Sequence, residues 1–236
     1  MARPGSAPDR LGHPRVHLRV TDSTNRVARE LAASGAVHGT LVTAREQTAG
    51  RGRQGRGWHA PPGAALVCSW VLRDPPPLLS LAAGVATAEV CGQRARVKWP
   101  NDVLIEGRKV AGILVEGRPQ EGWAVLGIGL NVALELSQLP NGVRERAATL
   151  GRAPQDIEPL LHSLCASLER WLAVPVDAVL DGIRARDALG GHLVRWESGV
   201  GTAAGIDSRG RLLVACGDGS RVALDAGEVH LGGAWP

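Results

Sequence analysis

The chain has 236 residues with 44% hydrophobic and 21% charged side chains, enough for one medium domain and a smaller one with a packed core. Its net charge of +4 comes without a Lys/Arg block or a run of aromatic residues, so it suits an anionic ligand better than a nucleic acid. No apolar run approaches the roughly 18 residues that span a bilayer, and the start lacks the apolar core of a signal peptide. We therefore expect a cytoplasmic protein with no membrane partner.

In chain order, the sequence begins with a segment, 1–15, that we expect to be a flexible tail. Alternating polar and apolar residues then predict a strand at 16–20. A helix follows to Gly35, because the N-cap residues of the segment 22–24 precede an amphipathic run. From there to residue 189, apolar periodicity and Gly/Pro turns predict strands at 39–44, 64–73, 96–99, 102–107, 108–117 and 122–132, and helices at 78–92, 156–172 and 177–189.

After residue 189 the pattern changes to five short strands separated by Gly, Asp and Ser turns. We therefore predict an α+β fold in which residues 16–189 form a main domain with a mixed sheet and flanking helices. Residues 190–236 are expected to form a small C-terminal β-barrel of the SH3-like type. The cysteines lie far apart and none forms a C-x-x-C pair, so we expect buried apolar side chains and no zinc site.

The stretch EQTAGRGRQGRGW, residues 46–58, contains the Gly-x-Gly-x-x-Gly pattern of dinucleotide-binding proteins. That fingerprint requires a helix that starts inside it, whereas here a Pro-Pro-Gly turn and a strand follow. We interpret the stretch as a glycine-rich loop in which Arg51, Arg53 and Arg56 bind phosphate or carboxylate groups and which orders on an anionic ligand. A solvated basic turn is the simpler alternative.

Both lysines of the chain, Lys98 and Lys109, lie in the segment KWPNDVLIEGRK, whereas every other basic residue except histidine is arginine. Because Lys offers a compact ammonium where Arg offers a planar fork, this clustering indicates a candidate site. Asn101 and Asp102 lie at a turn, where they either bind a ligand or satisfy backbone groups. Lys109 begins an apolar strand, and Gly112 within it allows a ligand or another backbone to approach closely.

The motif DSTN, residues 22–25, caps a helix, and a helix N-terminus with hydroxyl groups also binds anions or carbonyl groups. Together with EQTAGRGRQGRGW, KWPNDVLIEGRKVAGILVE and GIGLNV, in this order, it closely resembles the biotin protein ligases from about residue 16 to the end. The resemblance implies a class II synthetase-like catalytic domain of the biotin/lipoate ligase type, followed by the small barrel. It implies an enzyme that forms biotinyl-5′-AMP from biotin and ATP and then transfers biotin to one lysine of a biotin carboxyl carrier protein.

The resemblance also implies roles for individual residues. Lys109, Arg51 and Asp102 are the predicted catalytic residues: the cations stabilise charge on the reacting phosphate, and Asp102 orients or deprotonates the acceptor lysine. Mg²⁺ would be bound mainly by phosphate oxygens, and no protein residue is predicted as its ligand. The predicted biotin-binding residues are Ser23, Thr24, Asn25, Gln47, Gly50, Arg51, Gly52, Arg53, Lys109 and Gly112. The predicted nucleotide-binding residues are Arg53, Arg56, Trp58, Asn101 and Asn131.

Some members of the family carry a helix-turn-helix domain before the catalytic domain. Only about 15 residues precede the first predicted strand here, so we expect a monofunctional ligase that does not bind DNA. Its oligomeric state stays open between a monomer and a homodimer that pairs through sheet edges. Three alternatives remain: a lipoate or octanoate transferring enzyme on the same fold, a nucleic-acid-binding module, and a binding protein that keeps the pocket without turnover.

Overall fold

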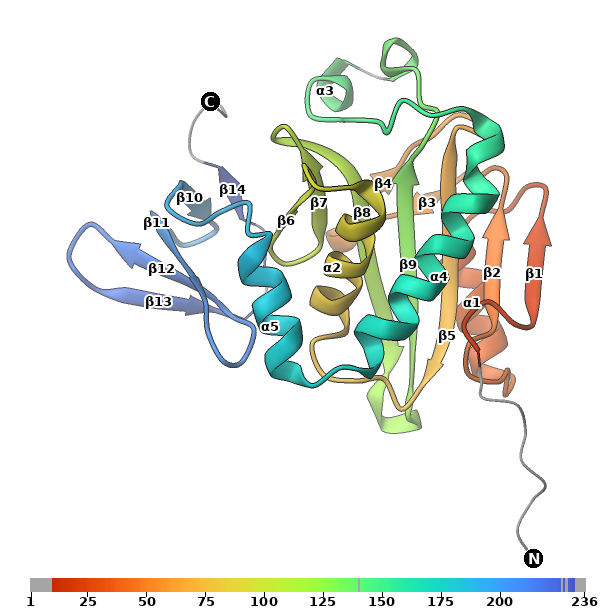
Figure 1. Ribbon diagram of the computed structural model, residues 1–236, viewed down its shortest axis with the longest axis horizontal. Coiled ribbons are helices and arrows are strands. Elements are labelled where there is room, and N and C mark those ends of the chain that lie inside the picture. Colours follow the sequence, from red (N-terminus) through yellow and green to blue (C-terminus); the bar gives the residue numbers. More distant parts are fainter. Residues whose placement is uncertain (1–9, 140, 226, 228, 232–236) are drawn as a thin grey trace, which may run out of the picture.

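The computed structural model describes residues 10–139, 141–225, 227 and 229–231. They form a seven-stranded mixed sheet with helices on both faces, followed by a smaller C-terminal sheet (Figure 1). The strands of the large sheet are β1 Arg15–Leu18, β2 Leu41–Ala44, β5 Ala65–Arg73, β6 Arg96–Lys98, β7 Asp102–Ile105, β8 Arg108–Arg118 and β9 Trp123–Asn131. Their spatial order is β1-β2-β5-β9-β8-β7-β6, in which β1 and β2 run parallel and every other pair is antiparallel.

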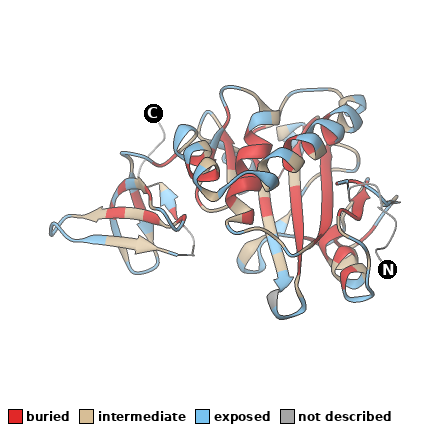
Figure 2. Ribbon diagram, turned by 60° about the horizontal axis from the view of Figure 1, so that its bottom comes forward, coloured by how far each residue is buried: buried red, intermediate tan, exposed pale blue. Residues whose placement is uncertain are grey.

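Helices cover both faces of this sheet, because its central strands carry apolar residues on both sides that must be buried. Trp70 and its neighbours on alternate positions of β5 belong to the large core that includes α2, α4 and α5, whereas Val71 packs in the smaller core under α1. Figure 1 shows α1 on the opposite face of the sheet from α2 and α4, and Figure 2 shows the central strands as buried. The helices are α1 Thr24–Ala33, α2 Leu79–Cys91, α3 Asn141–Arg144, α4 Ile157–Ala173 and α5 Val176–Ala185. Short 3-10 helices span Arg53–Gly55, Pro119–Glu121, Leu136–Gln138 and Pro154–Asp156. The predicted mixed sheet with flanking helices is thus confirmed. On the face that carries α1, this helix leaves part of the sheet uncovered.

The N-terminal segment packs onto the body earlier than the sequence predicts. Residues 1–9 of the expected tail lie outside the described residues. Leu11 is only 5% exposed, and its backbone N–H donates to Glu169 Oε1 at 2.9 Å. Residues 10–15 are therefore part of the packed structure. Only one apolar side chain, Leu11, holds them there, and a single apolar residue gives no periodic pattern from which the packing could be predicted.

The C-terminal sheet contains β10 Leu193–Trp196, β11 Gly199–Ile206, β12 Leu212–Cys216, β13 Arg221–Leu224 and β14 His230–Leu231. The five predicted short strands are confirmed, and they pair antiparallel in the order β13-β12-β11-β10-β14. Within the described part of the chain the two edge strands do not pair, so the sheet is not closed into a barrel there. Its apolar residues continue the large core, and the Trp99 indole donates to Gly210 O at 2.9 Å, which fixes the sheet beside the main domain.

None of the helices in the described ranges combines the length and apolar character needed to cross a bilayer.

Candidate active site

A cavity of about 710 Å³ lies on the face of the large sheet that carries α1. Its wall comes from the start of α1, the ends of β7, β8 and β9, the segment 51–59 and residues of the C-terminal sheet including Val229 and His230. Segments from the whole length of the chain therefore meet around one pocket.

Glycines form the floor of this pocket. Gly112 on β8 lies directly opposite Gly129 on β9, and the Trp58 ring covers both. A Cβ atom at Gly129 would lie 2.5 Å from Trp58 Cε2, and one at Gly112 would lie 3.4 Å from Trp58 Cζ3. The close approach predicted for Gly112 is thus observed, and its partner is an indole and the Lys109 side chain.

One end of the pocket is closed by the N-terminus of α1. Ser23 is the N-cap residue in extended conformation and makes no side-chain cap bond, so its hydroxyl does not serve as the predicted cap. The Thr24 backbone N–H instead donates to Gln47 Oε1 at 2.7 Å. Because Oε1 faces the helix, the Gln47 amide nitrogen faces Gly50, where a Cβ atom would lie 2.9 Å from it. Ser23 and Thr24 are 2% and 4% exposed, so this end offers buried polar groups to a ligand.

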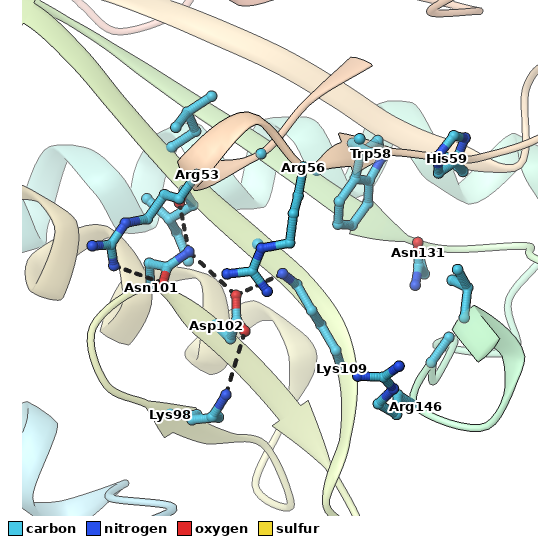
Figure 3. A pocket seen from close by; sticks show the side chains of 18 of the residues that line it. Arg53, Arg56, Trp58, His59, Lys98, Asn101, Asp102, Lys109, Asn131 and Arg146 are labelled. Atoms are coloured by element: carbon cyan, nitrogen blue, oxygen red, sulfur yellow. Dashed lines mark hydrogen bonds and ion pairs between the residues drawn. The ribbon is translucent and has the colours of Figure 1, made fainter. Parts of the chain in front are cut away.

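The other end of the pocket carries positive charge. Lys109 Nζ lies 2.6 Å from Asp102 Oδ1, and Lys98 Nζ lies 4.0 Å from Asp102 Oδ2 (Figure 3). Lys109 also lies 5.9 Å from the centroid of the Trp58 ring, within the range of a cation–π contact. The two lysines of the chain thus converge on one carboxylate, as their clustering in the sequence suggested.

The arginine-rich stretch forms a short hairpin over the pocket, with β3 Gly50–Arg51 paired to β4 Gly57–Trp58. Arg53 donates to Asn101 Oδ1 at 3.1 Å, which ties the hairpin tip to the turn before β7 (Figure 3). The Asn101 amide in turn donates to Ile113 O at 3.1 Å. The only helix that starts inside the stretch is the three-residue 3-10 helix Arg53–Gly55, and strand β4 follows it. The α-helix that a dinucleotide fingerprint requires is absent from these described residues, so the rejection of that fingerprint is confirmed.

Asn131 presents an unpaired acceptor at the end of β9. Its Nδ2 donates to Ala148 O at 2.8 Å, whereas its buried Oδ1 has no hydrogen-bond partner. The same segment bonds to Lys109, because Lys109 N donates to Arg146 O and Ala148 N donates to Lys109 O, both at 2.7 Å. A buried orphan acceptor costs free energy unless a donor reaches it, so Asn131 Oδ1 is a candidate contact for a ligand N–H.

Every residue predicted for catalysis, biotin or nucleotide lines this pocket except Gly50. Gly50 is a buried residue of the hairpin strand β3, where a Cβ atom would lie 2.6 Å from Trp58 O, so a glycine there allows close packing of the two hairpin strands. Several residues that shape the pocket or support its walls were not predicted from the sequence: Ser69, Glu116, Gly127, Gly129, Arg146 and His230. The alternating glycines of GIGLNV were the available signal, because a central strand loses packing at each glycine unless something else fills the space.

The chemistry of the donor groups excludes two kinds of site within the described residues. No group of three or more His, Cys, Asp or Glu side chains could hold a metal ion there, and Asp102 already pairs with lysine. The pocket residues therefore fit a Mg²⁺ ion that arrives with a phosphate ligand and is bound mainly by the phosphate oxygens. Cys68 is among the residues around the pocket, but its thiol belongs to the large core, where burial raises its pKa well above its usual value, so it is protonated at neutral pH and unsuited to act as a nucleophile.

Comparison with known proteins gives the same family in sequence and in structure. Residues 17–132 match the model of the Biotin/lipoate A/B protein ligase family, and residues 197–232 match the Biotin protein ligase C terminal domain. The chain is 40% identical to a biotin--[acetyl-CoA-carboxylase] ligase of Mycobacterium tuberculosis, over 89% of this chain and 86% of the relative. It is 35% identical to the ligase of that name from Paracoccus denitrificans, over 92% of this chain and 100% of the relative.

A second group of relatives is longer. The chain is 32% identical to the bifunctional ligase/repressor BirA of Bacillus subtilis, and the match covers 94% of this chain but 75% of the relative. Among solved structures, a biotin protein ligase from Aquifex aeolicus in complex with biotin and ATP superimposes with a TM-score of 0.76 at 26% identity, over 93% of this chain and 98% of the other. The resemblance seen in the sequence motifs is confirmed: the chain belongs to the biotin protein ligase family.

Proposed function

We propose that this protein is a biotin–[biotin carboxyl-carrier protein] ligase, which activates biotin with ATP and transfers it to one lysine of a carrier protein. One observation carries the proposal: a single pocket joins a neutral, hydrogen-bonding end at Thr24 and Gln47 to a cationic end at Lys109. Such a pocket matches a substrate with a polar ring at one end and a carboxylate that must meet a phosphate at the other.

In the first step a biotin carboxylate oxygen attacks the α-phosphorus of ATP, and the bond to the departing pyrophosphate breaks. Two anions must approach each other, so the step needs cations in a site that excludes water. We assign Lys109 to the reacting carboxylate and phosphate, and Asp102 to holding the Lys109 ammonium in place through their 2.6 Å contact. Arg51, Arg53 and Arg56 would bind phosphates, and Mg²⁺ would supply further charge neutralisation on the phosphate oxygens.

We assign the nucleotide base to the region between Trp58 and Asn131. The Trp58 ring lies over the glycine floor and offers a flat apolar surface, and the unpaired Asn131 Oδ1 can accept an amino N–H of adenine. Asn101 would act on the nucleotide indirectly, because its Oδ1 accepts a hydrogen bond from Arg53 at the hairpin tip. The hairpin would protect the mixed anhydride from water while the carrier protein binds.

In the second step the amine of the acceptor lysine attacks the biotinyl carbonyl carbon. An amide bond forms, AMP leaves with the electrons of the anhydride C–O bond, and the attacking nitrogen loses a proton. Asp102 remains our candidate to orient this amine. Its Oδ1 contacts Lys109 Nζ at 2.6 Å, whereas its Oδ2 lies 4.0 Å from Lys98 Nζ and is the oxygen with the weaker contact in the described residues.

The decisive experiment is incubation of the protein with biotin, ATP, Mg²⁺ and a carrier domain, read by the mass of the product. We expect one biotinyl group on one lysine of the carrier. The nearest rival is a lipoate ligase on the same fold, and ATP–pyrophosphate exchange stimulated by lipoate but not by biotin would overturn our assignment. Tight, salt-sensitive binding to DNA or RNA would favour the nucleic-acid module instead.

We further propose that residues 16–189 act as the catalytic domain and that residues 190–236 form an SH3-like domain beside it. The five antiparallel strands and the match to the C-terminal domain model support this division. We propose a cytoplasmic enzyme that does not bind DNA, and a gel-shift assay with promoter DNA tests that point. Sedimentation with and without biotin and ATP would distinguish a monomer from a homodimer.

A further inference from the structure

The position of Asn25 is unusual, because both of its polar side-chain atoms are already engaged within the protein. Its Nδ2 donates to Glu116 Oε2 at 2.9 Å, and its Oδ1 lies 2.6 Å from the Ser69 hydroxyl oxygen. The side chain fills the space left by Gly127, where a Cβ atom would lie 1.9 Å from Asn25 Oδ1. Asn25 therefore lines the pocket with both polar side-chain atoms bonded to other residues of the protein.

These contacts belong to a longer chain of polar groups. At one end Arg29, whose side chain is 41% exposed, donates to Glu116 Oε1 at 3.1 Å. At the other end the Ser69 hydroxyl lies 2.8 Å from the Thr24 hydroxyl. The chain Arg29–Glu116–Asn25–Ser69–Thr24, which we call the relay, thus connects the surface to the closed end of the pocket. Ser69 is fully buried, and Thr24 and Asn25 are each 4% exposed.

The relay determines where each proton lies. The Glu116 carboxylate accepts only, so it fixes the Asn25 amide with nitrogen toward Glu116 and oxygen toward Ser69. That amide oxygen carries no proton, so the Ser69 hydroxyl must donate to it. Ser69 then has no proton left for Thr24, so in the 2.8 Å contact between the two hydroxyl oxygens we assign Thr24 as the donor.

The second neighbour of the Thr24 hydroxyl does not change this result. Gln47 Oε1 lies 3.1 Å from Thr24 Oγ1 and is also an acceptor, since it takes the Thr24 backbone N–H at 2.7 Å. The Ser69 oxygen, at 2.8 Å, is the nearer of the two acceptors, so the Thr24 hydroxyl proton is directed at Ser69 and into the protein. Thr24 Oγ1 therefore presents a lone pair to the pocket and acts as a hydrogen-bond acceptor.

We propose that the Arg29–Glu116–Asn25–Ser69 relay is a specificity device that fixes Thr24 as an acceptor for a ring N–H of the substrate. The proposal rests on the proposed function, in which the ureido ring of biotin occupies this end of the pocket. A lipoyl dithiolane ring carries no N–H and leaves that acceptor unpaired, which disfavours it. Glu116 and Ser69 are positioning residues here, since they act through Thr24.

The experiment measures biotin affinity by calorimetry without ATP for Glu116→Leu, Ser69→Ala and Glu116→Gln. Glu116→Leu and Ser69→Ala are each expected to weaken biotin binding about five- to tenfold, the effect of one ordinary hydrogen bond. In Glu116→Gln the amide oxygen still accepts from Asn25, so affinity should stay within about twofold of the parent. The KM for ATP and the kcat at saturating biotin should change by less than about twofold in all three variants.

A double-mutant cycle tests whether the relay acts through Thr24. Thr24→Val removes the hydroxyl at nearly constant volume, and in that background Ser69→Ala should add less than about a twofold loss of affinity. Glu30→Ala is the matched control, because Glu30 forms an ion pair with Arg26 on the same helix but lies outside the relay. Thermal melting checks that each variant is folded.

The outcomes separate the two proposals. Parent protein that binds no biotin overturns the proposed function and the relay together. Parent protein that binds biotin, with fully additive losses in the cycle or with unchanged affinity in folded Ser69→Ala, overturns the relay alone.

Discussion

Lys109 illustrates how one residue can be fixed from several directions. Its ammonium contacts Asp102 at 2.6 Å and the Trp58 ring at 5.9 Å, and its side chain is 37% exposed, so it remains accessible to a ligand. Its backbone is bonded on both sides to the segment 146–148. The charge is therefore positioned by contacts that do not depend on the substrate, which is what a preorganised cation requires.

We predict that Lys109→Ala lowers the rate of biotinyl-AMP formation at least about tenfold, because the main cation near the reacting groups is lost. The measurement is ATP–pyrophosphate exchange with biotin. The melting temperature should stay close to that of the parent, and Arg118→Ala, at the far end of the same strand, should exchange normally. Near-parental exchange by Lys109→Ala would show that another residue supplies the cation.

At the scale of the element, strand β9 carries the pocket floor through alternate glycines. Gly127 makes room for Asn25, and Gly129 makes room for Trp58. An added methyl group at Gly129 would lie 2.5 Å from the Trp58 ring, closer than such contacts can be, so the ring must move.

We predict that Gly129→Ala reduces adenylate formation about tenfold or more, because the displaced ring enters the space assigned to the nucleotide. The effect should appear as a raised KM for ATP in initial-rate measurements. Gly217→Ala is the control, since a Cβ atom there would meet nothing within 4 Å. An unchanged KM for ATP would argue against the placement of the base beside Trp58.

Helix α1 also has a pH-dependent element at its N-terminus. Hydrogen bonding to Arg26 lowers the pKa of Asp22 from 3.8 to about 2, with help from the Ser23 backbone N–H. A carboxyl group whose pKa is depressed on folding stabilises the fold above its unfolded pKa and loses that contribution as pH falls through its folded pKa. The stabilisation is therefore complete above about pH 4 and disappears towards about pH 2.

We predict that Asp22→Asn lowers the melting temperature at pH 7 and that the difference from the parent shrinks between about pH 4 and pH 2. Melting curves followed by circular dichroism at several pH values measure this difference. A gap that stays constant across this range would show that the Asp22 charge does not contribute.

The elements themselves were largely predictable from the sequence. Strand and helix positions follow from apolar periodicity bounded by Gly and Pro turns, and these signals are local. The segment 134–152, with α3, was left without a predicted element, since its polar residues show no periodicity. The contact of Asn25 with biotin stays a prediction, whereas its bonds to Ser69 and Glu116, residues 44 and 91 positions away, were not predicted. No local pattern contains that information.

At the scale of the whole molecule, the two sheets act together at the site. Trp99, three residues before Asp102, is held by Gly210 of the C-terminal sheet, and His230 of β14 lines the same pocket. The C-terminal sheet therefore supports the turn that carries Asn101 and Asp102. Its contribution to the site follows from packing between distant segments, which the sequence alone did not indicate.

The composition of the whole chain has a consequence for how the reactive intermediate is handled. Biotinyl-AMP that escapes from a ligase acylates exposed lysine amines, and this chain has only two lysines, both beside Asp102. We predict that Arg51→Ala, which removes a predicted clamp on the adenylate, labels lysines of a bystander protein such as albumin more than the parent does. The enzyme itself should gain at most the few groups that its amino terminus and the two site lysines allow.

Intact-mass measurement of both proteins after incubation with biotin and ATP tests this prediction, with Arg195→Ala on β10 as the control for loss of an exposed arginine. The two masses answer different questions, because bystander labelling reports escape of the intermediate and self-labelling reports the supply of amines on the enzyme. An Arg51→Ala variant that leaves albumin unlabelled would show that Arg51 does not retain the adenylate. More biotinyl groups on the enzyme than its amino terminus and two lysines can carry would show that other side chains capture the intermediate, although the arginine guanidinium is protonated and a poor nucleophile at neutral pH.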